Sequence, residues 1–372
     1  MNILIITPDY PDNNRSVYTF VKQLVNQFAL LGHRCCVIAP YNVTRNKRFY
    51  QFREIEEIER STSVEVLRPN YLSFSETTIS NFRPSEFFRT MAIKKALRKL
   101  PFTPDVIYAH FWSSGRFVFK FAKNNNIPLF VASGESVIPN NDISPQYKEF
   151  YDYVSGVICV SSSKRDESVS KGLTRMEKCQ VIPNAINASL FRKQDKQECR
   201  RILGIPNDYF VVSFVGWFNE RKGVHRVAQA ITSIKGKTVY SMFIGGKDEI
   251  QCPNILVKDR IGHEKLPTYL NAADVFVLPT LNEGCCNAVI EAMACGLPVI
   301  SSDLPFNWDV LNDSNSILVD PKDIGQIADA IVRLRDDKEL RKKLSEGALL
   351  SAHNLTIEKR ADTILKFVES KI

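Results

Sequence analysis

The sequence contains no long apolar segment and no sign of an export signal. No run approaches the roughly 18 apolar residues that a membrane-spanning helix requires. The apolar run Ile3–Ile6 is too short for the core of a signal peptide, and no positive charge precedes it. These absences favour a cytoplasmic protein that has at most peripheral contact with the inner face of a membrane.

The sequence also lacks the residue spacings of metal and disulfide sites. Its nine cysteines are an odd number, and two adjacent pairs, at 35–36 and 285–286, are not arranged as C-x-x-C. No group of histidines and carboxylates has the spacing of metal ligands. Scattered, partly unpairable cysteines favour a reducing compartment. We therefore expect no bound metal and no cofactor.

Chain length and net charge indicate the number of domains and the kind of partner. A chain of 372 residues predicts two domains of about 150–190 residues each. The net charge of +8 suits an anionic partner such as a nucleoside diphosphate, a nucleic acid or an acidic lipid. The basic residues do not interleave with aromatic residues on one element, so nucleic-acid binding is disfavoured. No internal repeat or low-complexity segment occurs.

Short apolar runs alternate with amphipathic ones in both halves of the chain, which predicts parallel strands joined by helices. In the first half the expected strands are 3–6, 35–39, 105–109, 129–132 and 156–160. In the second half they are 210–215, 239–244, 255–257, 275–278 and 299–301. The polar stretch 42–59 is expected to be a mobile excursion.

The most informative stretch runs from Ala272 to Ser302. A buried strand, Val275–Leu278, is closed by Pro279, and a polar loop follows. Asn287 is expected to cap a short helix, which Gly296 ends.

Two carboxylates, Glu283 and Glu291, carry the chemistry of this stretch. Glu283 is expected above the carboxyl edge of a parallel sheet, where ligands bind in doubly wound folds. Glu291 lies one turn beyond Asn287 on the same helix face. The helix N-terminus beside them suits a phosphate. This combination fits a nucleotide-activated sugar, with one carboxylate for the ribose and the other for the sugar. The alternative is a helix acid paired with a lysine and a solvated loop acid.

The stretch resembles the signature of glycosyltransferase family 4. Residues 274–279 read Asp-Val-Phe-Val-Leu-Pro, and residues 283–300 read Glu-Gly-x-x-Asn-x-x-x-Glu-Ala-Met-Ala-Cys-Gly-x-Pro-Val-Ile. The resemblance implies an α/β protein of GT-B fold, in which two Rossmann-like doubly wound parallel-sheet domains face each other across a cleft. The expected domains are 1–183 for the acceptor, completed by a C-terminal helix at 356–372, and 184–355 for the donor.

A second motif, residues 216–223, resembles the phosphate clamp of the family, Gly-Arg-x-x-x-x-Lys-Gly. Lys222, and Arg221 beside it, can direct positive charge at a diphosphate. Trp217 stands where the family has arginine. Arg260 and Ile261 match the place where the family holds the nucleotide base. The expected donor-binding residues are Gly216, Arg221, Lys222, Arg260, Ile261, Glu283, Gly284, Cys285, Cys286, Asn287 and Glu291.

The resemblance is weaker in the first half, where the acceptor is expected to bind. The loop after the first strand has no glycine, and its Asn14, Arg15 and Ser16 are candidates for acceptor contact. His110 follows a strand end and is another candidate, although a lone histidine there is more often structural. Ser133 replaces a histidine of the family. Glu135 beside it is proposed as an acceptor contact or base, and with Glu283 and Lys222 it completes the expected catalytic set.

A basic amphipathic segment, residues 90–100, is the candidate membrane contact. Ile93, Ala96, Leu97 and Leu100 form an apolar stripe, and lysines and arginines cover the other face. The alternative is an ordinary surface helix packed on the sheet.

The resemblance implies a retaining glycosyltransferase, and the absence of metal-ligand spacing predicts that it is metal-independent. A UDP-sugar is favoured over GDP-mannose as the donor, and the acceptor is expected to be a saccharide or a lipid-linked saccharide in cell-surface polysaccharide biosynthesis. A nucleotide-sugar epimerase of the same fold and a binding-only relative remain alternatives.

Overall fold

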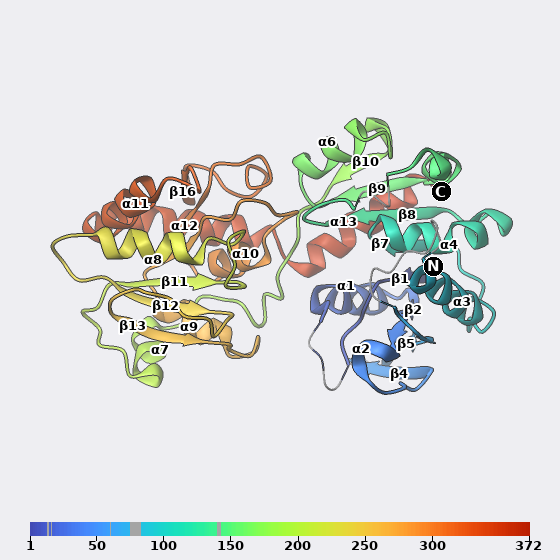
Figure 1. Ribbon diagram of the computed structural model, residues 1–372, viewed down its shortest axis with the longest axis horizontal. Helices are drawn as coiled ribbons and strands as arrows, with labels where there is room; N and C mark the ends of the chain where they lie inside the picture. Colours follow the sequence, from blue (N-terminus) through green and yellow to red (C-terminus); the bar gives the residue numbers. More distant parts are fainter. Residues whose placement is uncertain (13–14, 16, 60, 75–82, 140–142) are drawn as a thin grey trace. The chain divides into compact units, whose positions relative to one another are not determined.

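The chain divides into two compact units (Figure 1). The computed structural model describes residues 1–372 except 13–14, 16, 60, 75–82 and 140–142. The first unit comprises residues 1–160, 164–182 and 360–372, and the second comprises 161–163 and 183–359. The sequence placed the division between 183 and 184 and assigned the last helix, from 356, to the first domain.

The first unit is built on an eight-stranded sheet in the order β10-β9-β8-β7-β1-β2-β5-β4. All neighbouring strands are parallel except β4 and β5. The strands are β1 (Asn2–Ile6), β2 (Arg34–Ile38), β4 (Arg53–Ile58), β5 (Thr62–Leu67), β7 (Val106–His110), β8 (Leu129–Ser133), β9 (Gly156–Cys159) and β10 (Cys179–Val181). The helices include α1 (Thr19–Leu30), α3 (Pro84–Leu97), α4 (Trp112–Asn124), α5 (Lys148–Tyr153), α6 (Ser162–Ser170) and α13 (Ile357–Glu369).

The segment 42–59, expected to be a mobile excursion, contains regular structure. It includes the helical turn α2 (Val43–Asn46) and the edge strand β4, and its first residue pairs in a short ribbon of β3 (Tyr41–Asn42) with β6 (Asn70–Tyr71). The inner face of β4 is ionic, since Glu54 and Glu56 face the buried Arg68, with Glu54 3.2 Å from its Nε. A strand whose inner face carries glutamates has no apolar alternation to reveal it.

The apolar stripe of the segment 90–100 packs inward, as the alternative of an ordinary surface helix expects. Ile93, Ala96 and Leu97 of α3 belong to the hydrophobic core of the first unit, and Leu100 packs against that core. Within the described residues, no helix has both the length and the apolar character that crossing a membrane requires.

The second unit is a six-stranded parallel sheet in the order β13-β12-β11-β14-β15-β16. Its strands are β11 (Val211–Val215), β12 (Tyr240–Ile244), β13 (Ile255–Asp259), β14 (Val275–Leu278), β15 (Val299–Ser302) and β16 (Ser316–Val319). Its helices are α7 (Lys196–Leu203), α8 (Val224–Ser233), α9 (Leu266–Ala272), α10 (Asn287–Ala294), α11 (Ile324–Asp336) and α12 (Lys338–His353).

The strand order of the second unit reverses between β11 and β14. From β11 the chain winds outward through β12 and β13, and from β14 it winds the other way through β15 and β16. Open α/β sheets bind ligands at the carboxyl ends of the strands beside such a reversal. Two loops occupy this position here, residues 216–223 after β11 and residues 279–286 after β14. The predicted α/β class, with parallel doubly wound sheets, is confirmed.

Candidate active site

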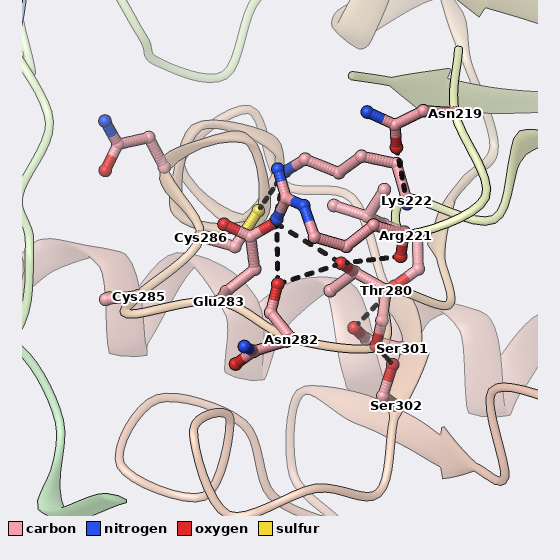
Figure 2. Close-up of polar contacts among 12 residues, drawn as sticks. Asn219, Arg221, Lys222, Thr280, Asn282, Glu283, Cys285, Cys286, Ser301 and Ser302 are labelled. Atoms are coloured by element: carbon pink, nitrogen blue, oxygen red, sulfur yellow. Dashed lines mark hydrogen bonds and ion pairs between the residues drawn. The ribbon is translucent and has the colours of Figure 1, made fainter. Parts of the chain in front are cut away.

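The loops after β11 and β14 are joined by hydrogen bonds, so they form one surface (Figure 2). The carbonyl oxygen of Arg221 accepts from the backbone N–H of Leu281 at 2.8 Å and from Oγ1 of Thr280 at 3.1 Å. Ser302, at the end of β15, donates its hydroxyl to the carbonyl of Thr280. These bonds fix the strand-end loops against each other.

Glu283 lies at the centre of this surface, between two cations. Its Oε1 is 2.8 Å from Nζ of Lys222 and forms a second ion pair with Arg221. Arg221 also donates to the carbonyl of Asn282 at 2.8 Å. The Glu283 and Lys222 side chains are largely buried, whereas that of Arg221 is 37% exposed. The structure therefore brings together three of the residues that the sequence singled out.

Lys222 is held in its charged form despite burial. Burial is the largest single effect and lowers the pKa of its ammonium group, but Cys286 and Glu283 together outweigh it, and the pKa is raised. Burial raises the pKa of the Cys286 thiol, whose Sγ lies 3.8 Å from Lys222 Nζ. The closest charged partner of Lys222 is Glu283, whose Oε1 lies 2.8 Å from Nζ.

Glycine is required where the strand-end loops pass close to one another. Gly245 has φ +129°, and a Cβ at this position would lie 2.2 Å from the carbonyl oxygen of Gly216. Gly223 has φ +80°, and its Cβ would lie 2.7 Å from the carbonyl oxygen of Pro279. Gly223 therefore serves the contact between the two loops as well as the start of α8.

The helix N-terminus beside Glu283 is formed differently from the prediction. Cys286 is the N-cap of α10, and Asn287 is its first helical residue, so the prediction that Asn287 caps the helix is wrong. Asn287 Oδ1 instead accepts from Nδ2 of Asn184 at 2.8 Å, and Asn184 also donates to the carbonyl of Cys285 at 3.2 Å. Sequence reasoning missed Asn184, because a contact across about a hundred residues leaves no local signal.

Glu291 projects from α10 and contacts His263, which the sequence did not suggest. His263 Nε2 lies 3.0 Å from Glu291 Oε1, and the imidazole packs on Phe191 with 4.9 Å between ring centroids. The hydrogen bond to Glu291 raises the pKa of His263, against the opposing effect of burial. His263 thus orients the carboxylate that the sequence assigned to the ribose.

We expect the His263–Glu291 pair to stabilise the protein below neutral pH and to lose this effect as pH rises. The pKa of His263 is higher in the folded than in the unfolded protein, so protonation favours folding until pH passes the folded value. His263→Gln should cost about 0.5 kcal/mol near pH 6, a small value because solvent screens this partly exposed pair. Thermal unfolding from pH 5.5 to 8.5 measures the difference, which should shrink toward pH 8.5. The exposed His225→Gln is the control, and a difference that is constant with pH would contradict the pairing.

Arg260 and Trp217 meet at the same edge of the sheet. The Arg260 guanidinium carbon lies 5.3 Å from the centre of the Trp217 ring, which is 61% exposed. Trp217 holds the position of the arginine in the phosphate clamp of the family. In this chain the guanidinium of Arg260, from the loop after β13, stacks on the Trp217 ring. Ile261, the second candidate for base contact, is half-buried beside it.

In the first unit, Glu135 has a structural partner. Its carboxylate accepts from the backbone N–H of Trp112 at 3.0 Å and from the hydroxyl of Ser133 at 3.3 Å. An anion at this point satisfies a donor of the first turn of α4. Ser133, in the position of the missing histidine, accepts from the indole N–H of Trp112 at 3.2 Å.

The remaining acceptor-side candidates differ in their surroundings. His110 is buried at the end of β7, and among the described residues neither ring nitrogen has a hydrogen-bond partner. Burial lowers its pKa to about 3, so the ring is neutral. Arg15 is held by Asp9 and Asp12 at 2.9 and 2.8 Å. Asn14 and Ser16 lie outside the described residues.

Two family models match the chain one after the other. The model of Glycosyltransferase Family 4 matches residues 17–190, and that of Glycosyl transferases group 1 matches residues 195–351. The second match contains both loops described above. The chain is a family 4 glycosyltransferase.

Individual relatives and solved structures agree with this assignment. The glycosyltransferase is 27% identical over 358 residues to the putative teichuronic acid biosynthesis glycosyltransferase TuaC of Bacillus subtilis, covering 91% of this chain and 90% of the relative. It is 30% identical over 227 residues to the Escherichia coli UDP-Gal:alpha-D-GlcNAc-diphosphoundecaprenol alpha-1,3-galactosyltransferase, covering 56% and 58%.

Among solved structures, sucrose-phosphate synthase of Thermosynechococcus elongatus matches with a TM-score of 0.77 at 20% identity, covering 99% of this chain and 98% of that one. Anabaena HepE in complex with UDP and glucose matches with a TM-score of 0.73 at 16% identity, over 100% of both chains. These likenesses confirm the predicted GT-B fold of the family 4 glycosyltransferase.

Proposed function

We propose that this glycosyltransferase moves a sugar from a UDP-sugar to a lipid-linked saccharide during the synthesis of a cell-surface polysaccharide. Transfer retains the anomeric configuration and uses no metal ion. The observation that carries the proposal is Glu283, held between Lys222 and Arg221 at the strand-order reversal, beside the first turn of α10.

The proposed reaction leaves negative charge on the departing diphosphate, and this surface supplies positive charge. Lys222 stays protonated, Arg221 is always protonated, and the N-terminus of α10 adds unpaired backbone N–H groups and a dipole. Fixed charges of this kind stabilise a leaving anion without reorganising. In other transferases a divalent cation stabilises the charge on the leaving group, and these fixed charges replace it.

The carboxylates of Glu291 and Glu283 each bind a different part of the donor. Glu291, oriented by His263, accepts hydrogen bonds from the vicinal hydroxyls of the ribose. Glu283 accepts from the hydroxyls of the transferred sugar and keeps the two cations in place. Arg260, in the loop after β13, stacks on Trp217, in the loop after β11. The resemblance puts the nucleotide base beside Arg260.

The comparisons support the choice of substrates. The HepE structures hold UDP and UDP-glucose, and one named relative uses UDP-Gal with an acceptor linked to diphosphoundecaprenol. Other named relatives act in teichuronic acid, capsular polysaccharide and lipopolysaccharide core biosynthesis.

A donor panel tests the proposal. Purified protein is incubated in EDTA with UDP-, GDP- and ADP-sugars and a lipid-diphosphate saccharide, and the product linkage is determined by NMR. We expect a UDP-sugar to be consumed and the anomeric configuration to be retained. Dependence on added magnesium, inversion, or consumption of GDP-mannose alone would contradict the proposal. A free isomerised sugar nucleotide formed without acceptor would indicate the epimerase alternative, and unchanged activity in cells of both Glu283→Ala and Lys222→Ala would favour the binding-only one.

We also propose peripheral contact with an anionic membrane, through residues other than the predicted stripe. Phe87 and Met91 of α3 are 47% and 54% exposed, and Phe88 packs near them. A cavity of about 630 Å³ beside them is lined by apolar residues and by three cations of the same helix region, Lys94, Lys95 and Arg98. Apolar side chains with adjacent cations suit the interface of an anionic bilayer.

Charge and apolar substitutions on this surface should both weaken binding to vesicles. Met91→Asp should lower co-sedimentation with phosphatidylglycerol vesicles about tenfold, since it replaces an inserted apolar group by a like charge. Lys94→Glu/Lys95→Glu should lower it by a similar factor at low salt and less at high salt. Leu350→Asp, at a leucine of α12 that is more exposed than Met91, is the control. Equal loss in the control would contradict this surface.

A further inference from the structure

A second cluster of positive charge lies at the opposite edge of the donor-side sheet. A cavity of about 290 Å³ is lined by residues that directly precede strands, Asp274 before β14 and Pro298 before β15. Cys295 and Gly296, which end α10, line it as well. The cavity therefore opens at the amino ends of the strands, whereas the loops of the candidate active site follow their carboxyl ends.

Five cations line this cavity, and they come from two helices and the segment before one of them. The cations are Lys193, Lys196, Lys338, Arg341 and Lys342. Asp274 is the single carboxylate among the lining residues. It is already engaged, because it pairs with Lys196 and with the buried Arg200 and accepts from the backbone N–H of Val211 at 2.7 Å. The positive charge at the cavity thus exceeds the negative charge beside it.

Three of the cations share one face of α12. Lys338 is its first residue, and Arg341 and Lys342 follow at the i+3 and i+4 positions. The N-terminus of α12 is already satisfied by Asp337, which caps it and accepts from the backbone N–H of Leu340. Lys196 is the first residue of α7, which Asp195 caps in the same way. The capping aspartates do not line the cavity, whereas the cations do.

Two of the cations are held in position by other contacts, and three are available. Lys196 is tied to Asp274, and Arg341 donates to the carbonyl of Arg335 at 3.1 Å with its guanidinium 5.5 Å from the Phe210 ring centre. Among the described residues, no carboxylate forms an ion pair with Lys193, Lys338 or Lys342. A bound anion would relieve the repulsion between these groups.

We propose that this cavity binds a small phosphate-bearing anion, of the size of a diphosphate or a sugar phosphate, at a site separate from the donor site. Several ammonium groups and a guanidinium lining one cavity suit phosphate oxygens. Because the cavity includes the residues that end α10, the bound anion contacts the same helix whose first turn forms part of the candidate active site.

Calorimetric titration with inorganic pyrophosphate tests the assignment. The titration is made at 150 mM salt with saturating UDP, so that the donor site is occupied. We expect binding to one site in the wild-type protein, and about a tenfold rise in Kd for Lys338→Ala/Lys342→Ala, because each lost charge-assisted hydrogen bond weakens binding. The matched control is Lys343→Ala, an exposed lysine of the same helix that does not line the cavity. The Kd for UDP should be unchanged in all three proteins, which separates this result from any failure of the donor site.

Two results would overturn the assignment. One is the absence of pyrophosphate binding when UDP is present, and the other is an equal Kd in the double variant and the control. Vesicles containing phosphatidic acid distinguish a lipid headgroup from a free anion. If the double variant loses co-sedimentation and pyrophosphate does not compete with the vesicles, the lysines bind a membrane. That result would overturn the small-anion site. Co-sedimentation that is the same in wild type and double variant supports it.

Discussion

Replacing Lys222 by alanine is expected to lower kcat about 10²–10³-fold, the effect of removing one preorganised charge-stabilising group from a transition state. The ammonium group is buried, stays protonated and lies 2.8 Å from Glu283. The fold should survive, because Glu283 keeps its ion pair with Arg221 and its hydrogen bond from Thr280. Steady-state kinetics with the donor found by the panel measures the change.

Two comparisons make this experiment specific. Lys235→Ala, an exposed lysine after α8, should leave kcat unchanged. Lys222→Arg keeps the charge but not the compact ammonium geometry, so it should recover part of the rate. A Lys222→Ala enzyme with wild-type kcat and a raised KM alone would show that Lys222 binds donor and transition state equally, contrary to the proposed role.

Asp274→Ala is expected to lower the free energy of unfolding by about 3–5 kcal/mol, because it leaves a buried charge without its partner. Arg200 is 3% exposed, and its guanidinium lies 2.8 Å from Asp274. The same carboxylate accepts from Val211 at the start of β11 and pairs with Lys196. Thermal unfolding should show a fall in Tm of roughly 10 °C.

Partner substitutions separate loss of charge from loss of packing. Asp274→Asn keeps an acceptor for the Val211 N–H and should cost less than Asp274→Ala. Adding Arg200→Met to Asp274→Ala removes the uncompensated guanidinium and should restore part of the stability. If the double variant is as unstable as the sum of the two single ones, the pair is not coupled as the contacts indicate.

The second unit of the protein was predictable because its signals are local. The run Val275–Leu278, the loop to Gly284 and the helix that follows all come from adjacent residues, and the ion pairs of Glu283 join the two motifs that the sequence had singled out. Spacing within a strand-loop-helix unit places side chains at the edge of a sheet before any tertiary contact is known.

What the sequence did not reveal depends on contacts between distant segments. His263 and Asn184 reach α10 from 28 and 103 residues away. The sequence did not predict β4, because its inward-facing glutamates pair with Arg68. Its sequence pattern therefore resembled that of a solvated loop. The stripe on α3 was located correctly as an apolar face, but periodicity cannot tell a face that packs on a sheet from one that meets a membrane.

The ionic face of β4 also bears on how the molecule behaves at high concentration. β4 is the outermost strand of its sheet, and its free edge offers unpaired backbone groups to any strand of another molecule. Charges flank that edge on both faces, with Arg53 and Glu57 on the exposed one and Glu54 and Glu56 on the other. A second copy pairing in register would bring like charges opposite one another, so the pattern that concealed the strand in the sequence also opposes edge-to-edge aggregation.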